Sequence, residues 1–448
     1  MTSSPGQNRW AIAGAGTVVM VCLGTVYSWS IFTRPLIASQ HWSNTVTTWA
    51  FAIAIFTLGI GAVVGGRWQD RVGPRTVTIA GVILWGVGNL LAGLGTPSFG
   101  APWLYITYGV IGGFGNGMAY ITPVATVTKW FPDKRGLASG MVVMGFGLGA
   151  FFYNQIVTRL ASFAMAAKHA TAYIAAKDAA VKAGTAFDPS TLPPDASVTS
   201  ADTAAIFAVF LVSGIVFVIV GGLCAALLSN PPEGYSVPGA VAGAAQSGRN
   251  FTPGEVLRVP QFYLLWLMLF LNVTAGILII SNAVPIYSDL TGATAAVAGA
   301  VYGFLAVFNG LGRFFWGAVS DRLGRNRTYV LIFLIQASVF FVLGRLHDFT
   351  AVGICFAVVL LCYGGGFGTM PSFNADYFGT KYMGANYGMI ITAWGVAGLV
   401  GPLVAAFVKD RTGSFTGALV PVAIMLLVAA VLPFVTRKPA VLAAVAAT

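Results

Sequence analysis

The chain has 448 residues, of which 57% are hydrophobic and 8% charged, and its mean hydropathy is +0.82. Soluble domains carry about 25% charged residues, so this composition excludes an ordinary soluble domain and indicates a membrane protein. The formal net charge of +11 does not imply a nucleic-acid partner, because the basic residues are spread between long apolar segments. We expect no nucleic acid, a lipid bilayer around the chain and a monomer.

Long apolar segments recur along the whole chain. A helix needs roughly 20 apolar residues to cross a bilayer, and lipid offers no partner to an unsatisfied backbone amide. The sequence therefore predicts an all-α membrane protein with twelve transmembrane helices. We place them at about 10–33, 46–66, 76–95, 103–129, 137–160, 204–229, 259–284, 295–316, 328–345, 350–375, 386–408 and 415–436.

The basic residues between these segments give an orientation. With the N-terminus inside, fifteen Lys and Arg residues lie on the cytoplasmic side and eight on the other. This excess follows the positive-inside rule. We therefore expect both termini to be cytoplasmic, in a prokaryotic cytoplasmic membrane. We expect no cleavable signal peptide, because the first apolar run is too long and has no clear cleavage site.

Two short patterns recur about 250 residues apart. Residues 66–73 (G-R-W-Q-D-R-V-G) correspond to 317–324 (G-A-V-S-D-R-L-G), and residues 130–136 correspond to 377–381. Order and spacing match, so the chain reads as two pseudo-symmetric six-helix bundles. In each copy we expect the acidic residue to cap or pair at helix ends that separate and rejoin. The conformational residues predicted in this way are Asp70, Arg71, Asp321 and Arg322.

The repeat also predicts the domain boundaries. We expect an N-terminal bundle over 1–229, a cytoplasmic linker over 230–257 and a C-terminal bundle over 258–448. One loop, 164–203, has no counterpart in the other half; we expect a short extracytoplasmic helix plus coil, and favour a tolerated insertion over a lid.

Glycines spaced four apart predict close helix packing. They are Gly109/Gly113/Gly117, Gly145/Gly149, Gly299/Gly303 and Gly364/Gly368. The run 145–150 loosely resembles a dinucleotide fingerprint, but no strand precedes it and no acidic residue follows about 20 positions later, so helix packing is the better interpretation.

One basic residue, Arg313, falls inside an apolar segment. Asp321 marks the end of that helix eight residues later, which puts Arg313 roughly 12 Å deep at 1.5 Å per residue. An intramembrane charge is expensive and indicates function, although a snorkelling or structurally paired arginine is the alternative. No Asp or Glu occurs at comparable depth. A guanidinium can clamp a carboxylate with two parallel bonds, and Asn309, one turn away, could assist.

Aromatic residues in other segments complete the predicted substrate-binding set, although each alone is more often a packing residue. They are Tyr27, Tyr120, Phe146, Tyr363, Phe367 and Trp394. The four cysteines lie in apolar segments without metal-type spacing and are interpreted as buried small residues. We expect no metal and no cofactor.

The paired 66–73 and 317–324 loops resemble the signature of the major facilitator superfamily, although Pro74 stands where a basic residue is usual. A narrower resemblance, to the oxalate/formate antiporter and monocarboxylate transporter branch, rests on Tyr27-Ser-Trp-Ser, residues 130–140, residues 308–313, and residues 374–379 with 386–388. It covers nearly the whole chain apart from 164–203. It implies that Arg313 contacts a substrate carboxylate, with Asn309 beside it. The aromatic cage that it implies consists of Tyr27, Tyr120, Phe146, Tyr363 and Phe367.

The resemblance also has an informative departure. The oxalate-specific antiporter has a lysine in its eleventh helix. Trp394 stands at the corresponding position here, in a segment (386–408) without charge. A single cation facing an apolar wall suits a monoanion such as lactate or pyruvate, since a dianion would leave a large desolvation cost. We therefore expect a small carboxylate anion as substrate.

Coupling stays open at this point. His41, His169 and His347 fall on the extracytoplasmic side and no carboxylate lies at mid-depth, so either a proton accompanies the anion or a counter-anion returns.

The leading hypothesis is an alternating-access transporter of monocarboxylates, proton-coupled, with an oxalate/formate-type exchanger as the alternative. The sequence shows no metal cluster, P-loop or nucleophile–base pair, which argues against an intramembrane enzyme. A non-transporting carboxylate sensor is the alternative from another class.

Overall fold

The computed structural model describes residues 8–194, 197–237, 249–412 and 415–439, and all regular structure in these ranges is helical. The first half contains α1 (Arg9–Gly24), η1 (Thr25–Ser28), α2 (Trp29–Gln40), α3 (Asn44–Val72), α4 (Pro74–Leu104), η2 (Tyr105–Gly112), α5 (Gly113–Trp130), α6 (Arg135–Val157), α7 (Ala161–Lys182), η3 (Pro189–Thr191), α8 (Ser200–Val216), η4 (Phe217–Gly221) and α9 (Gly222–Ala226). The second contains α10 (Pro253–Val256), α11 (Pro260–Thr291), α12 (Ala295–Leu305), α13 (Val307–Leu323), α14 (Arg325–Leu343), α15 (Phe349–Phe378), α16 (Met383–Thr412), η5 (Phe415–Ala418), α17 (Leu419–Ala429) and α18 (Leu432–Val435).

These helices form the twelve expected crossings. Ten stretches of the described chain are long and apolar enough to span a bilayer. One of them, Pro74–Trp130, has 57 residues and contains two predicted segments, which separate at Gly100, where φ is 70°. The shorter apolar stretch Leu419–Val435 forms the last crossing. The prediction of an all-α, twelve-helix membrane protein is confirmed.

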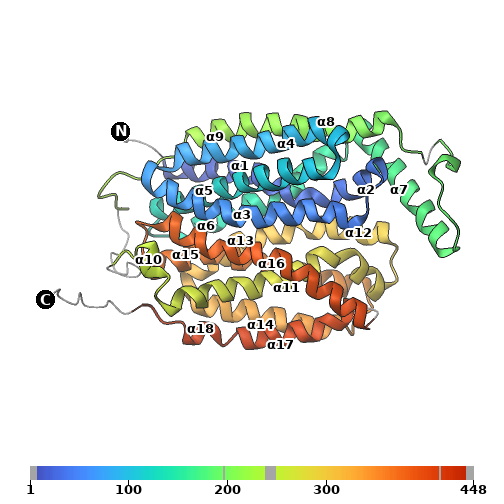
Figure 1. Ribbon diagram of the computed structural model, residues 1–448. Coiled ribbons are helices and arrows are strands. Elements are labelled where there is room, and N and C mark those ends of the chain that lie inside the picture. The colour runs from blue at the N-terminus through green and yellow to red at the C-terminus, as the bar shows by residue number, and fades with distance from the viewer. Residues whose placement is uncertain (1–7, 195–196, 238–248, 413–414, 440–448) are drawn as a thin grey trace.

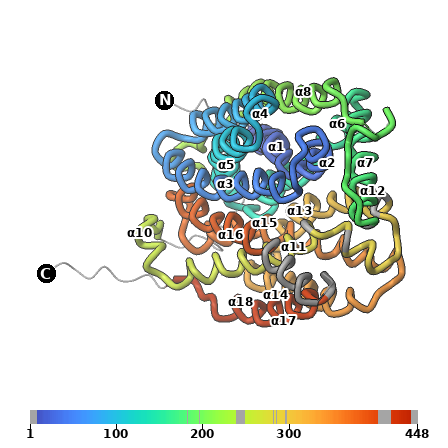
Figure 2. The backbone as a smooth tube through the Cα atoms, turned by 45° about the vertical axis from the view of Figure 1, so that its right-hand side comes forward, coloured from blue at the N-terminus to red at the C-terminus, as the bar shows by residue number. Residues whose placement is uncertain are grey.

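The crossings run side by side in two groups (Figure 1). Helices from the first half of the chain lie above those from the second, and the view turned by 45° shows the same division (Figure 2). The start of α1, the short α10 and the end of α18 lie at one end of the bundle, called here the linker end; α7 lies at the opposite, far end. The predicted boundaries at 230 and 257 stay a prediction, and residues 238–248 lie outside the described residues.

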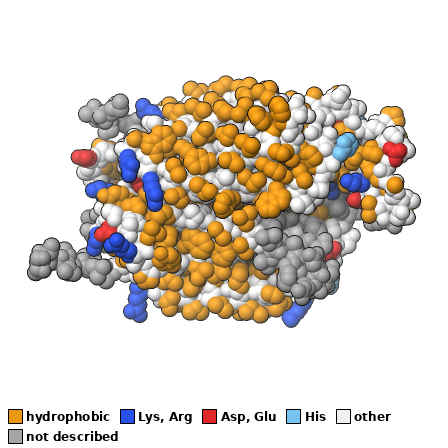
Figure 3. Space-filling view, in the orientation of Figure 1, with side chains coloured by type: hydrophobic (Ala, Val, Ile, Leu, Met, Phe, Trp, Pro, Cys, Tyr) orange, Lys and Arg blue, Asp and Glu red, His pale blue; other side chains and the backbone are white. Residues whose placement is uncertain are grey.

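The visible outer surface has the character of a membrane protein. Hydrophobic side chains cover the middle of the bundle, and most Lys and Arg side chains gather toward its two ends (Figure 3). Large side chains such as Phe56, Leu223 and Ile354 are exposed there, by 42%, 69% and 60%. Lipid tails, rather than water, suit such a surface.

The first crossing is interrupted, which the sequence did not predict. The α-helix stops at Gly24 and one turn of 3₁₀-helix, η1, carries Tyr27. The carbonyl groups of Cys22 and Leu23 accept hydrogen bonds from Trp85 Nε1 (3.2 Å) and Asn116 Nδ2 (2.9 Å), so polar side chains of neighbouring helices stabilise the break. This crossing then continues to Gln40, beyond the predicted end at 33.

The repeated loops have the same backbone conformation. Gly73 ends α3 with φ 90° and ψ 170°, and Gly324 ends α13 with φ 84° and ψ 152°. A positive φ is strained for residues with a side chain, so glycine is required at both turns. The sequence repeat is therefore also a structural repeat.

Three of the four predicted glycine groups make close helix contacts. A Cβ on Gly117 would overlap the carbonyl oxygen of Leu58, and one on Gly368 would overlap that of Arg313. The prediction was wrong for Gly299 and Gly303. No atom lies within 4 Å of a Cβ placed on Gly303, and only Val284 approaches one on Gly299, at 3.9 Å. Spacing alone does not show which face of a helix meets a neighbour.

The loop 164–203 contains a helix followed by irregular chain, as expected, but α7 is longer than predicted, with 22 residues. Tyr173 packs with Ala38 and Ala170, and its hydroxyl lies 3.0 Å from His41 Nδ1. His169 lies 2.9 Å from Asp202, in the first turn of α8. These contacts hold α7 against α2 and α8, at the far end of the first half.

We predict that Gly368→Ala destabilises the protein, because its Cβ would overlap the backbone of Arg313 and force α13 and α15 apart. Overpacking of this kind costs about 1–3 kcal/mol. Gly303→Ala is the matched control, since it places the same methyl group in open space. Thermal unfolding of the purified protein in detergent measures both; equal unfolding temperatures for the two variants would contradict the prediction.

Candidate functional site

Arg313 lies on α13, and its side chain is 0% exposed. Its Nε donates to the side-chain oxygen of Asn309 (3.2 Å), and Nη1 donates to the backbone oxygen of Val143 (3.4 Å). Nη2 has no hydrogen-bond partner among the described residues. Within the same part of the chain, no carboxylate forms an ion pair with Arg313.

Aromatic rings enclose the guanidinium. The ring centres of Phe146 and Phe367 lie 5.4 and 4.8 Å from Cζ of Arg313. Phe146 belongs to the first half of the chain and Phe367 to the second. Cation–π attraction offsets part of the cost of removing the charge from water. It does not replace a counter-charge, because a desolvated cation–π contact contributes only about 2 kcal/mol.

Trp394 stands at the centre of the aromatic cluster. Its ring centre lies 5.9, 5.7, 5.4 and 5.1 Å from those of Tyr27, Tyr120, Phe146 and Phe367. Four crossings besides α16 therefore meet at this one indole. Its side chain is 1% exposed.

Tyr363 closes the cluster from the second half of the chain. Its hydroxyl lies 3.1 Å from that of Tyr27, and its ring packs 5.4 Å from Phe367. All eight predicted binding residues are thus brought together, from three crossings of each half. Tyr27 is the one member of the eight that is partly exposed. That these residues bind an anion stays a prediction.

Backbone contacts fix this arrangement. A Cβ on Gly364 would overlap the carbonyl oxygen of Asn309, just as one on Gly368 would overlap that of Arg313. Consequently α15 touches α13 at the two residues that carry the site. Asn272 Nδ2 donates to the carbonyl of Tyr363 (3.1 Å) and supports α15 from α11.

At the linker end, the two halves are joined by carboxylates that cap helices of the opposite half. Asp321 accepts from two backbone N–H groups in the first turn of α6, both at 2.8 Å. Asp70 accepts from two in the first turn of α16, at 3.2 and 2.8 Å. The positive end of a helix stabilises a carboxylate, so both pairs favour contact between the halves.

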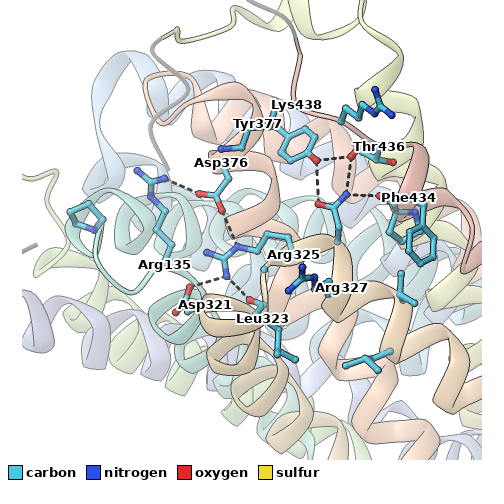
Figure 4. A pocket seen from close by; sticks show the side chains of 18 of the residues that line it. Arg135, Asp321, Leu323, Arg325, Arg327, Asp376, Tyr377, Phe434, Thr436 and Lys438 are labelled. Carbon is cyan, nitrogen blue, oxygen red and sulfur yellow. Dashed lines mark hydrogen bonds and ion pairs between the residues drawn. The ribbon is translucent and has the colours of Figure 1, made fainter. Parts of the chain in front are cut away.

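Basic side chains complete this closure (Figure 4). Arg325 lies 2.8 Å from Asp321 and 2.9 Å from Asp376, and Arg135 lies 2.9 Å from Asp376 across the two halves. Lys129 lies 3.8 Å from Asp70. These partners were not among the residues predicted from the sequence. Asp376, which belongs to the motif at residues 374–379, was the one signal that the sequence offered for them.

The two arginines of the repeated loops take no part in the closure. Arg71 and Arg322 are exposed, and neither forms an ion pair with any other described residue. Each directly follows its aspartate and therefore points about 100° away around the helix. The predicted capping role falls to Asp70 and Asp321 alone.

A cavity of about 1020 Å³ opens beside this closure, among the linker-end parts of α13, α14, α15 and α18. Arg325, Asp376, Tyr377, Phe434 and Lys438 are among its lining residues (Figure 4). None of the eight predicted binding residues lines it. It therefore belongs to the surface of the closure and not to the site around Arg313.

The histidines lie away from Arg313. His41 and His169 contact Tyr173 and Asp202, and His347 Nδ1 lies 3.0 Å from the carbonyl of Leu290. All three sit in far-end elements, as the sequence predicts. No cluster of three metal-ligating residues occurs within the described ranges.

Comparisons with known proteins agree with this architecture. The family model of the Major Facilitator Superfamily matches residues 15–402 and 291–447. The chain is 28% identical over 417 residues to the oxalate:formate antiporter of Oxalobacter formigenes, covering 92% of this chain and 88% of that one. It is 24% identical to apicoplast pyruvate carrier 1 of Toxoplasma gondii, covering 87% and 82%.

Solved structures show the same fold. The major facilitator superfamily transporter FucP in the outward conformation superposes with a TM-score of 0.67 at 15% identity, covering 95% of this chain and 99% of that one. The family match covers most of the chain, and the resemblance to the oxalate/formate antiporter and monocarboxylate transporter branch is confirmed. The chain therefore belongs to the Major Facilitator Superfamily, and it is a multi-pass membrane transporter, not an enzyme.

Proposed function

We propose that the protein is a secondary transporter of small monocarboxylate anions, of the size of lactate and pyruvate. The observation that carries this proposal is the guanidinium of Arg313, buried without a described carboxylate partner and with Nη2 unpaired. A substrate carboxylate supplies both the missing charge and a planar acceptor that matches the guanidinium fork. The aromatic rings around it suit the short apolar part of such an anion.

The absence of a second cation in the described site favours a single negative charge. Trp394 fills the position opposite Arg313 with an apolar ring packed on four others. A dianion would leave one carboxylate desolvated and unpaired, which costs several kcal/mol. Similarity to a pyruvate carrier and to an oxalate:formate antiporter supports a small carboxylate without deciding between these charges.

Alternating access fits the arrangement of the two halves. The Asp70 and Asp321 contacts hold the linker end closed, and Tyr27, in the interrupted first crossing, is the partly exposed member of the site. Movement of one half against the other would open the linker end and close the far end. We place the linker end in the cytoplasm, on the excess of basic residues there.

For coupling we propose that a proton accompanies the anion, because the loaded site then crosses without net change in charge. Within the described residues, no carboxylate or histidine lies in the site, so the structure gives no protein group there that would carry this proton. Anion exchange is the second candidate, favoured by the similarity to the oxalate:formate antiporter. Acidification speeds uptake in the first case and matters less in strict exchange.

A carboxylate sensor would bind the same anions without flux in proteoliposomes.

We predict that Arg313→Ala abolishes carboxylate uptake with expression unchanged. Arg313→Lys should retain less than about a tenth of the activity, because a point charge does not replace a bidentate fork. Uptake of labelled lactate or pyruvate into proteoliposomes measures both variants. Arg327→Ala, on the surface of α14, is the matched control and should transport normally. Uptake by Arg313→Ala at the level of the unmutated protein would rule out the proposed function.

A second prediction concerns the charge of the substrate. At neutral pH a monocarboxylate should compete for the site at least about tenfold better than oxalate, which carries two charges. Trp394→Lys should raise binding of oxalate relative to lactate, because the second carboxylate gains a partner. Competition binding on the purified protein measures both ratios. Preference of the unmutated protein for oxalate would overturn the monoanion assignment and leave the carboxylate carrier in place.

A third prediction concerns closure at the linker end. Asp321→Asn should weaken two charge-assisted bonds to α6 and the pair with Arg325, so that the linker end opens roughly tenfold more often. A cysteine at Ser139, buried between the halves, reports opening through its rate of thiol labelling in a background without the native cysteines. Asp133→Asn is the control, since the one ion pair of Asp133 with a described residue is to Arg9, of its own half. Equal labelling of the two variants would contradict the prediction.

A further inference from the structure

Three buried polar donors of the described chain meet without partners near the site. Arg313 Nη2, Tyr120 Oη and Tyr387 Oη form no hydrogen bond of ordinary length and angle with the described residues, and all three side chains are 0% exposed. Tyr120 belongs to α5, in the first half, whereas Tyr387 belongs to α16, in the second. Tyr387 was not among the predicted binding residues, although residues 386–388 belong to a motif of the sequence resemblance.

Tyr387 lies between the site and the closed linker end. It precedes Trp394 by seven residues, which is two helical turns, so both side chains project from the same face of α16. It is four residues from the start of α16, where Asp70 caps the helix. Its hydroxyl lies close enough to that of Tyr120 for a weak hydrogen-bond interaction, and it interacts electrostatically with Arg313. Tyr120 in turn interacts with Arg313.

Packing alone does not account for this phenol. Burying a hydroxyl without a partner costs about 1–3 kcal/mol, and phenylalanine would fill the same space without that cost. Other buried tyrosines in the second half have acceptors: Tyr287 donates to the carbonyl of Phe349 (2.6 Å) and Tyr329 to that of Gly366 (2.8 Å). The two phenols therefore indicate a hydrogen-bond acceptor that binds reversibly at this place.

We propose that Tyr387 is a further anion-binding residue, which together with Tyr120 donates to the substrate carboxylate on the linker side of Arg313. A carboxylate has about four lone-pair sites, so two phenol O–H groups can bind it together with the guanidinium. Hydroxyl donors to a carboxylate form short, charge-assisted bonds. This inference rests on the proposed function, and it extends the site by two turns toward the linker end.

The position of these donors gives them a role in transport. Tyr120 and Tyr387 belong to opposite halves, so an anion bound to both ties the halves together on the linker side of Arg313. Opening of the linker end separates the two phenols and therefore weakens their hold on the carboxylate. An empty carrier leaves both hydroxyls unpaired, whereas a loaded carrier satisfies them.

The test is the thermal unfolding of purified Tyr387→Phe in detergent, alone and with formate, acetate, lactate, pyruvate or oxalate. Without anion, the variant should unfold at the same temperature as the unmutated protein or higher, because an unpaired hydroxyl is removed. With the anion that stabilises the unmutated protein most, its apparent Kd should rise about tenfold. Tyr287→Phe is the matched control: it loses a made hydrogen bond, so its unfolding temperature should fall while its Kd stays unchanged.

The outcomes separate this inference from the proposed function. An unchanged Kd for Tyr387→Phe, or a lower unfolding temperature without anion, would overturn the inference and leave the Arg313 site intact. If none of the five anions stabilises the unmutated protein, the proposed function fails and the inference fails with it. In proteoliposomes, the affinity loss of Tyr387→Phe should be greater for anion supplied at the linker side, with orientation set by protease access to the linker. Equal loss on both sides would contradict the linker-side position.

Discussion

The structure depends on one electrostatic constraint, a guanidinium buried in the membrane interior with no described carboxylate to neutralise it. A charge in that place is stable only if its surroundings replace part of its hydration. Here Asn309 and the carbonyl of Val143 accept two of its donors, and two aromatic rings flank it. Under the proposed function, the remaining deficit favours an anion over a neutral molecule, because only an anion supplies the missing charge. The interrupted first crossing and the glycine contacts of α15 follow from the need to bring the enclosing groups near this charge.

Much of the fold could be predicted from the sequence because lipid imposes simple rules. Apolar runs of spanning length gave the twelve crossings, and the repeated Asp-Arg-x-Gly loops gave the two-part plan. Arg313 stood out for the same reason: a charge within an apolar run is rare and has few explanations. The resemblance also implies an aromatic cage around this charge, and the rings of Phe146 and Phe367 lie 5.4 and 4.8 Å from the guanidinium.

The remaining features depend on three-dimensional neighbours that a sequence does not specify. The break at Gly24 requires donors from Trp85 and Asn116, which are far away along the chain. Gly299 and Gly303 have the same spacing as Gly364 and Gly368, yet only the latter face a helix. Asp70 and Asp321 were expected at separating helix ends, but their acceptor role toward α6 and α16 could only be seen once the halves were placed.

The contact between α13 and α15 has a mechanical consequence. Backbone meets backbone at Gly364 and Gly368, so no flexible side chain separates the two helices and little shear is available between them. Arg313 and Phe367 consequently form parts of one stiff body. In the proposed movement of the two halves, the charge keeps its cation–π partner on α15, which belongs to the same half, while its distance to Phe146 on α6, which belongs to the other half, changes. An anion bound at Arg313 would therefore keep the same surroundings on the α15 side throughout the transport cycle. Its surroundings on the α6 side would differ between the two open states.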